Sequence, residues 1–211
     1  MLKRTMDVFL AGSLLVMTLP VLILAAIAIK LDSDGPVFFL QTRVGRHFTR
    51  FRIWKLRTMR VAHDGTLFTL DADSRVTRSG RWLRSLKVDE LPQLWNILRG
   101  DMSLVGPRPV VPELIKGFEP DYQRLLDVRP GLTDPATIKY CHEQEHLSRA
   151  ADQRLFYKTV VIPDKIRLSV GYLEEANLLK DLVILAQTAR ALLPVRRIPQ
   201  SAETHLTEEA Q

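Results

Sequence analysis

Two adjacent carboxylates are the clearest candidates for chemistry in this sequence. Asp89 and Glu90 stand just before Pro92. Because proline is tolerated in the first turn of a helix and disfavoured further in, Asp89 is predicted to lie at or beside a helix N-cap. The helix N-terminus favours negative charge, so we expect Asp89 to be ionised at neutral pH. Such a carboxylate can bind Mg²⁺ or attack phosphorus, although capping alone is the simpler alternative for an isolated Asp-Glu pair.

Basic side chains that could hold phosphate accompany this pair. Arg108 stands between Pro107 and Pro109, and a guanidinium offered from so rigid a loop suits bidentate binding of phosphate. Lys55 and Arg57 add further positive charge. A nucleophile, a divalent ion and cations on the non-bridging oxygens are the parts that phosphoryl transfer requires. The sequence contains neither a Walker A loop nor a glycine-rich dinucleotide fingerprint.

The distribution of charge also indicates an anionic partner. The chain of 211 residues has a net charge of +6, and 46% of its residues are apolar, enough to build a core. Residues 1–110 hold 17 Lys and Arg but only 9 Asp and Glu, whereas acidic residues are in excess after them. The first half is therefore expected to meet phosphates, nucleic acid or an acidic membrane surface. A single cysteine, Cys141, excludes an internal disulfide and a cysteine-based zinc site.

The first element that must position these groups is an apolar segment from Val8 to Ile29. As a helix it would measure about 33 Å, enough to cross a bilayer core of about 30 Å. Its length and the acidic Asp7 before it argue against a cleaved signal peptide. A spanning helix and a helix that bends and returns to the same face remain as alternatives.

Two features of this segment favour the re-entrant form. Pro20 lies near its middle, where proline removes a backbone hydrogen bond and breaks or kinks a helix. Basic residues flank both ends, with Lys3 and Arg4 before the segment and Lys30 after it. Since positive charge marks the cytoplasmic side, both ends are expected on that side. Thr18 is a candidate donor to a carbonyl that Pro20 leaves unpaired.

A basic and aromatic segment follows at residues 43–60. A turn at Asp34-Gly35-Pro36 and a β-prone run at 37–40 precede it. One interpretation is a surface that lies on anionic lipid headgroups. The alternative is a strand of a sheet with solvated arginines. Nucleic-acid binding fits the charge, but the adjoining apolar anchor argues against it.

The remaining pattern is helical. Helices are predicted at 80–86, at 91–98 with closure by Gly100, at 112–126 with an interruption near Gly117, at 143–160 and at 164–193. Residues 196–211 are predicted to be a disordered tail. The last helix carries one apolar face that we expect to pack on the core, with the membrane interface as the alternative; its members are Leu179, Leu182, Val183, Ala186, Ala189 and Leu193.

Ordered sequence blocks identify a family. The sequence resembles the bacterial sugar transferases, the monotopic phosphoglycosyl transferases that begin polysaccharide and glycoconjugate assembly. The resemblance covers nearly the whole chain, which looks like a minimal catalytic form. The matching blocks are Gly35–Phe39 (GPVFF), Lys55–Met59 (KLRTM), Asp73–Thr77 (DSRVT), Asp89–Asn96 (DELPQLWN), Gly100–Pro109 (GDMSLVGPRP) and Arg129–Thr133 (RPGLT).

The resemblance implies a mechanism and roles for five residues. The aspartate that matches Asp89 attacks the β-phosphate of a UDP-sugar, releases UMP and forms a covalent phosphosugar intermediate. Polyprenyl phosphate then attacks this intermediate and takes the phosphosugar. Glu90 completes the catalytic dyad, and Mg²⁺ is required, with Asp89 as its candidate ligand. Lys55 and Arg108 fall on positions that handle phosphate, and Arg84 on one that supports the dyad.

The resemblance also implies a mostly α fold with a small β element. Residues 1–31 would form a re-entrant membrane helix that breaks at Pro20, and residues 32–195 a compact α/β catalytic domain with interfacial amphipathic helices. This domain would lie on the cytoplasmic face of the bacterial inner membrane, against anionic lipid. Whether the chain forms a homodimer stays open. Two departures from the family pattern are Leu19, where many relatives have serine, and Asp134-Pro135, where many have Gly-Leu.

Overall fold

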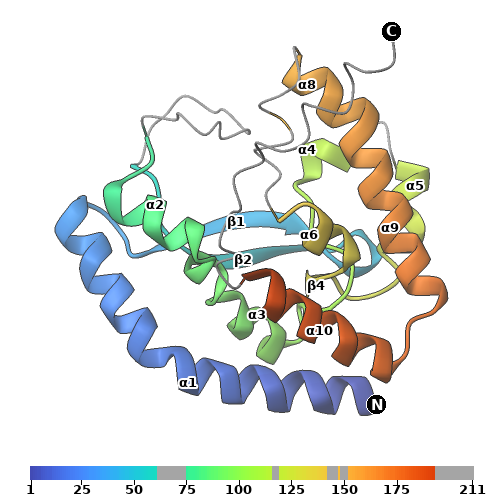
Figure 1. Cartoon of the computed structure of the whole chain (residues 1–211), viewed down its shortest axis with the longest axis horizontal. Coiled ribbons are helices and arrows are strands. Elements are labelled where there is room, and N and C mark those ends of the chain that lie inside the picture. Colours follow the sequence, from blue (N-terminus) through green and yellow to red (C-terminus); the bar gives the residue numbers. More distant parts are fainter. Residues whose placement is uncertain (61–74, 116–118, 142–146, 148–151, 193–211) are drawn as a thin grey trace, which may run out of the picture.

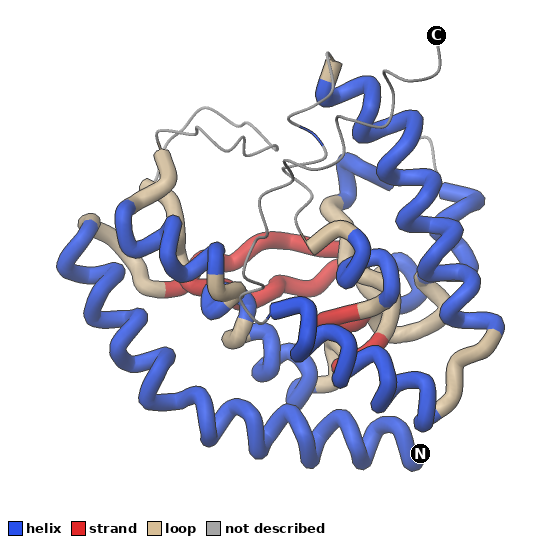
Figure 2. Tube along the Cα trace, viewed as in Figure 1, coloured by secondary structure: helices blue, strands red, loops and turns tan. Residues whose placement is uncertain are grey.

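A computed structural model describes the chain except for residues 61–74, 116–118, 142–146, 148–151 and 193–211. The described part is mostly helical with two small sheets, as expected, and Figures 1 and 2 show the helices arranged around a central hairpin. Its main elements are α1 (Leu2–Asp32), β1 (Phe38–Val44), β2 (Arg50–Leu56), α2 (Arg78–Ser85), η2 (Val88–Glu90), α3 (Gln93–Arg99), β3 (Ser103–Val105), α4 (Pro112–Ile115), α5 (Glu119–Leu125), β4 (Gly131–Thr133), α6 (Pro135–Lys139), α8 (Gln153–Phe156), η3 (Tyr157–Val161), α9 (Ile162–Glu174) and α10 (Leu178–Leu192).

The apolar N-terminal segment forms one continuous helix, α1, that includes Pro20. It is long and apolar enough to cross a membrane by length and composition. The expected interruption at Pro20 is not present: the helix is continuous through that residue, although Figure 1 shows that it bends near its middle. Thr18 donates its hydroxyl to the carbonyl of Leu14 at 2.7 Å, and not to the Val16 carbonyl, which would pair with residue 20 if that residue had an N–H.

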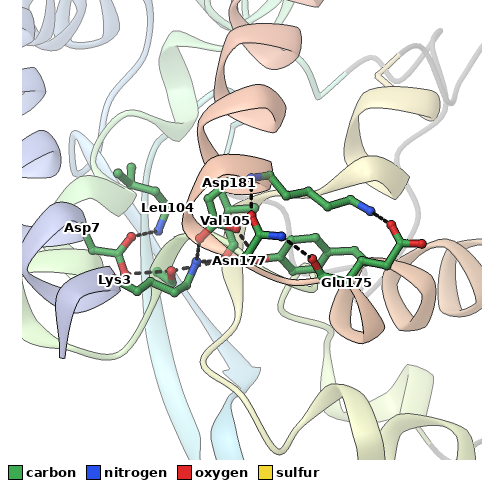
Figure 3. Close-up of polar contacts among 10 residues, drawn as sticks. Lys3, Asp7, Leu104, Val105, Glu175, Asn177 and Asp181 are labelled. Atoms are coloured by element: carbon green, nitrogen blue, oxygen red, sulfur yellow. Dashed lines mark hydrogen bonds and ion pairs between the residues drawn. The ribbon is translucent and has the colours of Figure 1, made fainter.

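The N-terminal end of α1 is bonded to the folded domain. Lys3 donates to the carbonyl of Val105 at 3.1 Å and forms an ion pair with Asp181 of α10 (Figure 3). The buried carboxylate of Asp7 accepts hydrogen bonds from Ser103 Oγ at 2.8 Å and from the backbone N–H of Leu104 at 3.0 Å. A buried carboxylate is tolerated only when it is bonded in this way, so these contacts specify where the helix begins.

The C-terminal end of α1 is bonded to the same domain. Asp32 accepts hydrogen bonds from the backbone and the hydroxyl of Ser79, at 2.7 and 2.8 Å. Ala25 and Ile29 pack in a buried cluster with Leu56 and Leu83. Both ends of the apolar helix therefore lie against one folded unit.

The basic segment forms the second strand of an antiparallel hairpin. β1 pairs with β2 in a register that places Phe39 opposite Lys55 and Val44 opposite Arg50. Side chains alternate across a strand, so Ile53 enters the core whereas Arg50 and Arg52 are exposed. The strand alternative for this segment is confirmed.

Helix α3 is the centre of the core. Leu94 and Ile97 are buried against Ala11 of α1 and Ile53 of β2. Asn96, fully buried, accepts a hydrogen bond from the backbone N–H of Trp54 at 3.0 Å and donates to the carbonyl of Arg52 at 2.8 Å, which joins α3 to the hairpin. The helix ends at Gly100 in a left-handed conformation (φ 93°), which confirms the predicted closure.

The C-terminal helices differ from the prediction. The helix expected at 164–193 is two helices, α9 and α10, and Asn177 begins the second by accepting a hydrogen bond from the backbone N–H of Lys180 at 2.9 Å. The face that we expected in the core is exposed; its described members are Leu179, Leu182, Val183, Ala186 and Ala189. Core packing of this face was the wrong interpretation.

Hydrogen bonding explains the rotation of α10. Asp181 is buried, where it accepts a hydrogen bond from the hydroxyl of Tyr172 at 2.6 Å and pairs with Lys3. A buried carboxylate needs these partners more than leucines need burial. Ile184, on the same side as Asp181, is buried with it. Of the helix predicted at 143–160, residues 143–146 and 148–151 lie outside the described residues, and the part from Gln153 onward is helical, as α8 and η3. The predicted tail at 196–211 also lies outside the described residues.

Candidate active site

Three segments far apart in the sequence bring Lys55, Glu90 and Arg108 together. Lys55 is the penultimate residue of β2, and Glu90 ends the short 3₁₀ turn η2. The residue before η2, Lys87, has a left-handed conformation (φ 55°) that turns the chain between α2 and η2. Arg108 follows β3 in the proline-bounded loop. The hairpin, η2 and the loop after β3 therefore each supply one charged group.

Glu90 joins the two cations. Its Oε1 accepts a hydrogen bond from Lys55 Nζ at 3.0 Å and another from the guanidinium of Arg108. Burial alone would raise the pKa of Glu90, but the charges and hydrogen bonds of Arg108 and Lys55 outweigh it and hold that pKa well below its usual range. Burial lowers the pKa of Lys55 even though Glu90 opposes that shift. Glu90 is therefore an anion that fixes the positions of two cations, Lys55 and Arg108.

Asp89 is buried beside this cluster with one oxygen unused. Asp89 is only 8% exposed, and its Oδ1 has no hydrogen-bond partner among the described residues. It does not cap α3, whose N-cap position is Pro92. Burial, together with the negative charge of Glu90, raises the pKa of Asp89, and Lys55 only partly offsets this. Asp89 lies in the first turn of the 3₁₀ helix η2, as expected for a residue at a helix start, but burial outweighs the factors that favour its ionised form.

Two glycines position the loop that carries Arg108. β3 and β4 run parallel, with Ser103 opposite Gly131. A Cβ at Gly131 would lie 2.1 Å from the backbone nitrogen of Gly106, so the two segments touch through their backbones. Gly131 donates its N–H to the carbonyl of Pro107 at 2.9 Å, which holds the loop at its first proline.

The other predicted cations take different places. Arg84 donates its Nε to Thr58 Oγ1 at 2.8 Å, and its charge acts to lower the pKa of Asp89. Arg57 is not brought to the cluster. Its buried guanidinium donates to the carbonyls of Ser33, at 2.7 Å, and of Asp34, and so ties the end of α1 to the hairpin.

Two further buried or partly buried polar residues, Gln93 and Arg43, were not singled out as site residues from the sequence. Gln93, one turn after Asp89, is only 1% exposed, and its Nε2 has no partner in the described chain. Arg43 donates to Gln41 Oε1 at 2.6 Å, and burial, followed by the charge of Arg108, lowers its pKa to about 10. The spacing of four residues between Asp89 and Gln93 is the one sequence signal that could have found Gln93.

Asp134 explains one departure from the family pattern. It is fully buried and begins α6 by accepting hydrogen bonds from the backbone N–H and the hydroxyl of Thr137, both at 2.7 Å. It also accepts one from the hydroxyl of Ser169 in α9 at 2.5 Å. Its charge helps to raise the pKa of Arg108, after the larger effect of Glu90. Asp134 thus joins α6 and α9 beside the loop that carries Arg108.

The donor set fits a Mg²⁺ ion that is shared with a substrate. The described residues contain no group of three His, Cys, Asp or Glu side chains that could enclose a metal. The unpaired Oδ1 of Asp89 offers one carboxylate ligand, while Glu90 is occupied by cations. Mg²⁺ is commonly held by one or two carboxylates together with substrate phosphates and water. The residues therefore suit a metal–diphosphate complex and not a cage made of protein alone.

Comparison with known proteins gives consistent matches. The profile of the bacterial sugar transferase family matches residues 1–194. The chain is 40% identical to UDP-glucose:undecaprenyl-phosphate glucose-1-phosphate transferase of Caulobacter vibrioides over 196 residues, 90% of this chain and 69% of that protein. It is 37% identical to UDP-N-acetylgalactosamine-undecaprenyl-phosphate N-acetylgalactosaminephosphotransferase of Aeromonas hydrophila, over 91% of this chain but 44% of that protein. It is 35% identical to the uncharacterized sugar transferase EpsL of Bacillus subtilis, over 99% of this chain and 94% of that protein.

Proposed function

Because this chain belongs to the bacterial sugar transferase family, we propose that it transfers a sugar 1-phosphate from a UDP-sugar to a polyprenyl phosphate and releases UMP. The observation that carries this proposal is the buried carboxylate of Asp89, whose Oδ1 has no partner among the described residues, beside a pair of cations held by Glu90. A diphosphate needs such cations on its oxygens, and a two-step transfer needs such a nucleophile.

In the first step Asp89 attacks the β-phosphorus. A bond forms between a carboxylate oxygen of Asp89 and phosphorus, the bond from phosphorus to the oxygen that bridges the two phosphates breaks, and its electron pair leaves with UMP. In the second step an oxygen of the polyprenyl phosphate attacks the same phosphorus. The bond to Asp89 breaks, its carboxylate is restored, and polyprenyl diphosphate sugar is formed.

Glu90 acts through the cations that it holds. Its lowered pKa keeps it ionised, so it does not take a proton during the transfer. Lys55 and Arg108 are instead presented to the phosphate oxygens at fixed positions, and the incoming diphosphate replaces part of the charge that Glu90 supplies to them. Arg84 and Lys55 lower the pKa of Asp89 and so favour the ionised nucleophile.

A bound Mg²⁺ would neutralise the diphosphate as it approaches Asp89. Asp89 would be the protein ligand, and the substrate phosphates and water would complete the shell. The protein's own contribution is to keep Glu90 engaged with Lys55 and Arg108, so that Asp89 is the carboxylate left for the ion.

The attachment of α1 supports a re-entrant topology with the domain on the cytoplasmic face. Both ends of α1 are bonded to one folded domain, through Lys3 and Asp7 at one end and Asp32 at the other. A helix that crossed the bilayer would place one of these ends on the far side. Helix α10 is joined to α1 through the ion pair between Asp181 and Lys3. The exposed apolar face of α10 would therefore lie in the membrane interface beside α1. Residues 1–31 would then form the membrane helix, and 32–195 the catalytic domain.

A UMP-release assay tests the proposal. The purified full chain is incubated with each of several UDP-sugars, with and without polyprenyl phosphate. We expect sustained UMP release only with the acceptor, and with UDP-sugar alone a single phosphosugar adduct on Asp89 in the intact mass. Asp89→Asn should fold and show neither. Sustained release of sugar phosphate without the acceptor would indicate a hydrolase, and no reaction with any UDP-sugar would refute the proposal.

A further inference from the structure

A second basic site lies at the opposite end of the hairpin from Glu90. A pocket of about 410 Å³ is formed by the turn between β1 and β2, the end of α3 and the segment before β4. Arg46, His47, Arg50 and Arg129 line it; we call it the turn pocket. Lys55 lies five residues beyond Arg50 on β2, about 17 Å along the strand, so the turn pocket is separate from the candidate active site.

The arginines of the turn pocket carry unbalanced charge. None of the three forms an ion pair with a carboxylate in the described part of the chain. Asp101, the acidic residue of the lining, pairs with Arg99 at 3.6 Å and accepts a hydrogen bond from Asn96 at 3.2 Å. The pocket therefore presents net positive charge to whatever enters it.

Two of these guanidiniums are held in place. Arg46 donates its Nε to the carbonyl of Asp127 at 2.8 Å, and Arg129 donates its Nε to the carbonyl of Gly100 at 2.9 Å. The terminal amino groups of both have no partner among the described residues. A guanidinium fixed in this way offers paired N–H donors that match the spacing of phosphate oxygens. The chemistry of the turn pocket therefore suits a phosphate group.

The turn pocket borders an apolar surface of α1. A Cβ at Gly100, which lines the pocket, would lie 3.5 Å from the guanidinium of Arg4. Arg4 in turn lies on one face of α1 with Met1, Val8 and Phe9, which form an exposed apolar surface. Phe9 is 71% exposed. Cationic and apolar surfaces thus meet at Arg4, at the end of the helix that we place in the membrane.

We propose that the turn pocket binds the phosphate headgroup of an anionic phospholipid, whose acyl chain lies along this exposed apolar face of α1. A soluble phosphate would use only the cations, whereas a phospholipid uses both surfaces. Phe48, in the turn between β1 and β2, is 45% exposed and would add an apolar contact to the lipid beside the arginines. The bound lipid would hold the domain at a fixed depth and orientation against the membrane, independently of the transfer reaction.

Lipid retention by the full chain tests this proposal. The protein is purified in a non-ionic detergent, titrated with phosphatidylglycerol or phosphatidylcholine, and bound lipids are counted by native mass spectrometry. We expect tight retention of phosphatidylglycerol alone. Arg50 is exposed and makes no side-chain bond in the described chain, so Arg50→Gln should fold, retain phosphatidylglycerol about fivefold less tightly and keep its UMP release.

A matched control and a competitor separate the alternatives. Arg81→Gln removes an exposed arginine from α2, which lies at the opposite end of the hairpin from the turn pocket (Figure 1). This variant should retain phosphatidylglycerol as the wild type does. Equal loss in both variants would mean that overall charge attracts the lipid and would overturn the site. Phe9→Ser should also weaken retention. If millimolar inorganic phosphate displaces the lipid and Phe9→Ser has no effect, the pocket binds a soluble anion, and the lipid assignment is wrong.

Discussion

Replacing Gly131 by alanine tests the backbone contact that positions Arg108. The new Cβ would lie 2.1 Å from the nitrogen and 2.3 Å from the oxygen of Gly106, whereas real Cβ contacts are essentially never under 3.0 Å. The two segments would have to separate by nearly 1 Å. The hydrogen bonds from Gly131 to Pro107 and from Gly106 to Thr133, both 2.9 Å, would then exceed normal length.

The cost follows from these contacts. Overpacking costs about 1 to 3 kcal/mol, and each lost hydrogen bond about 1 kcal/mol, so the free energy of unfolding should fall by about 3 to 5 kcal/mol. For a protein of this size that corresponds to a melting temperature lower by about 6 to 20 °C. Any protein that still folds should also lose UMP release, because the loop of Arg108 must move with Gly106.

Gly171 provides the matched control. It lies within α9, and a Cβ there would meet nothing within 4 Å. Gly171→Ala should therefore stabilise the helix by about 0.5 to 1 kcal/mol and raise the melting temperature slightly. Melting of both variants in detergent by circular dichroism gives the comparison. If Gly131→Ala melts with the wild type, β3 and β4 do not touch as described, and the placement of Arg108 is unsupported.

Four further results are expected. Arg108→Ala should cost about 3 kcal/mol in transition-state stabilisation, and Arg108→Lys should restore only part of the lost kcat/KM; full recovery would reduce the contact to a point charge. Excess chelator should abolish UMP release, and undiminished turnover would exclude the proposed Mg²⁺. Because burial raises the pKa of Asp89 and the attacking form is ionised, kcat/KM should fall as pH drops through that raised pKa. The charge of Lys87 lowers the pKa of Asp89, so Lys87→Gln should move this acidic limb of the pH profile to higher pH. An unmoved limb would assign the limb to another group. Single cysteines at positions 2 and 33 in a Cys141→Ser background should both resist impermeant thiol reagents in cells with only the outer membrane opened; labelling of position 2 alone would show a spanning helix.

Much of the candidate site was predictable because short motifs carried it. The spacing of Asp89 and Glu90 before Pro92, and the rigid loop around Arg108, predicted a nucleophile near phosphate-binding cations. The structure brings Lys55, Glu90 and Arg108 into contact as that hypothesis requires. The closure of α3 by Gly100 was equally predictable, since a left-handed residue after a helix is a local requirement that glycine meets.

Tertiary structure alone decided how the charged side chains are used. Sequence proximity suggested that Arg57 joins Lys55, but Arg57 lies just beyond the end of β2, and the nearby end of α1 engages its guanidinium through the carbonyls of Ser33 and Asp34. A helix N-terminus was expected to keep Asp89 charged; in the fold Asp89 lies in the first turn of η2, yet burial raises its pKa against the effect of nearby cations.

The rotation of α10 shows the same limit most clearly. Its apolar periodicity predicted a buried leucine face, yet the helix buries Asp181 because Lys3 and Tyr172, both distant in sequence, meet that carboxylate. Periodicity reports which residues share a face of a helix, and the sequence determined that much. Which face is buried depends on the partners that the rest of the chain brings to it, because a buried charge must be paired and an exposed leucine can be covered by a membrane.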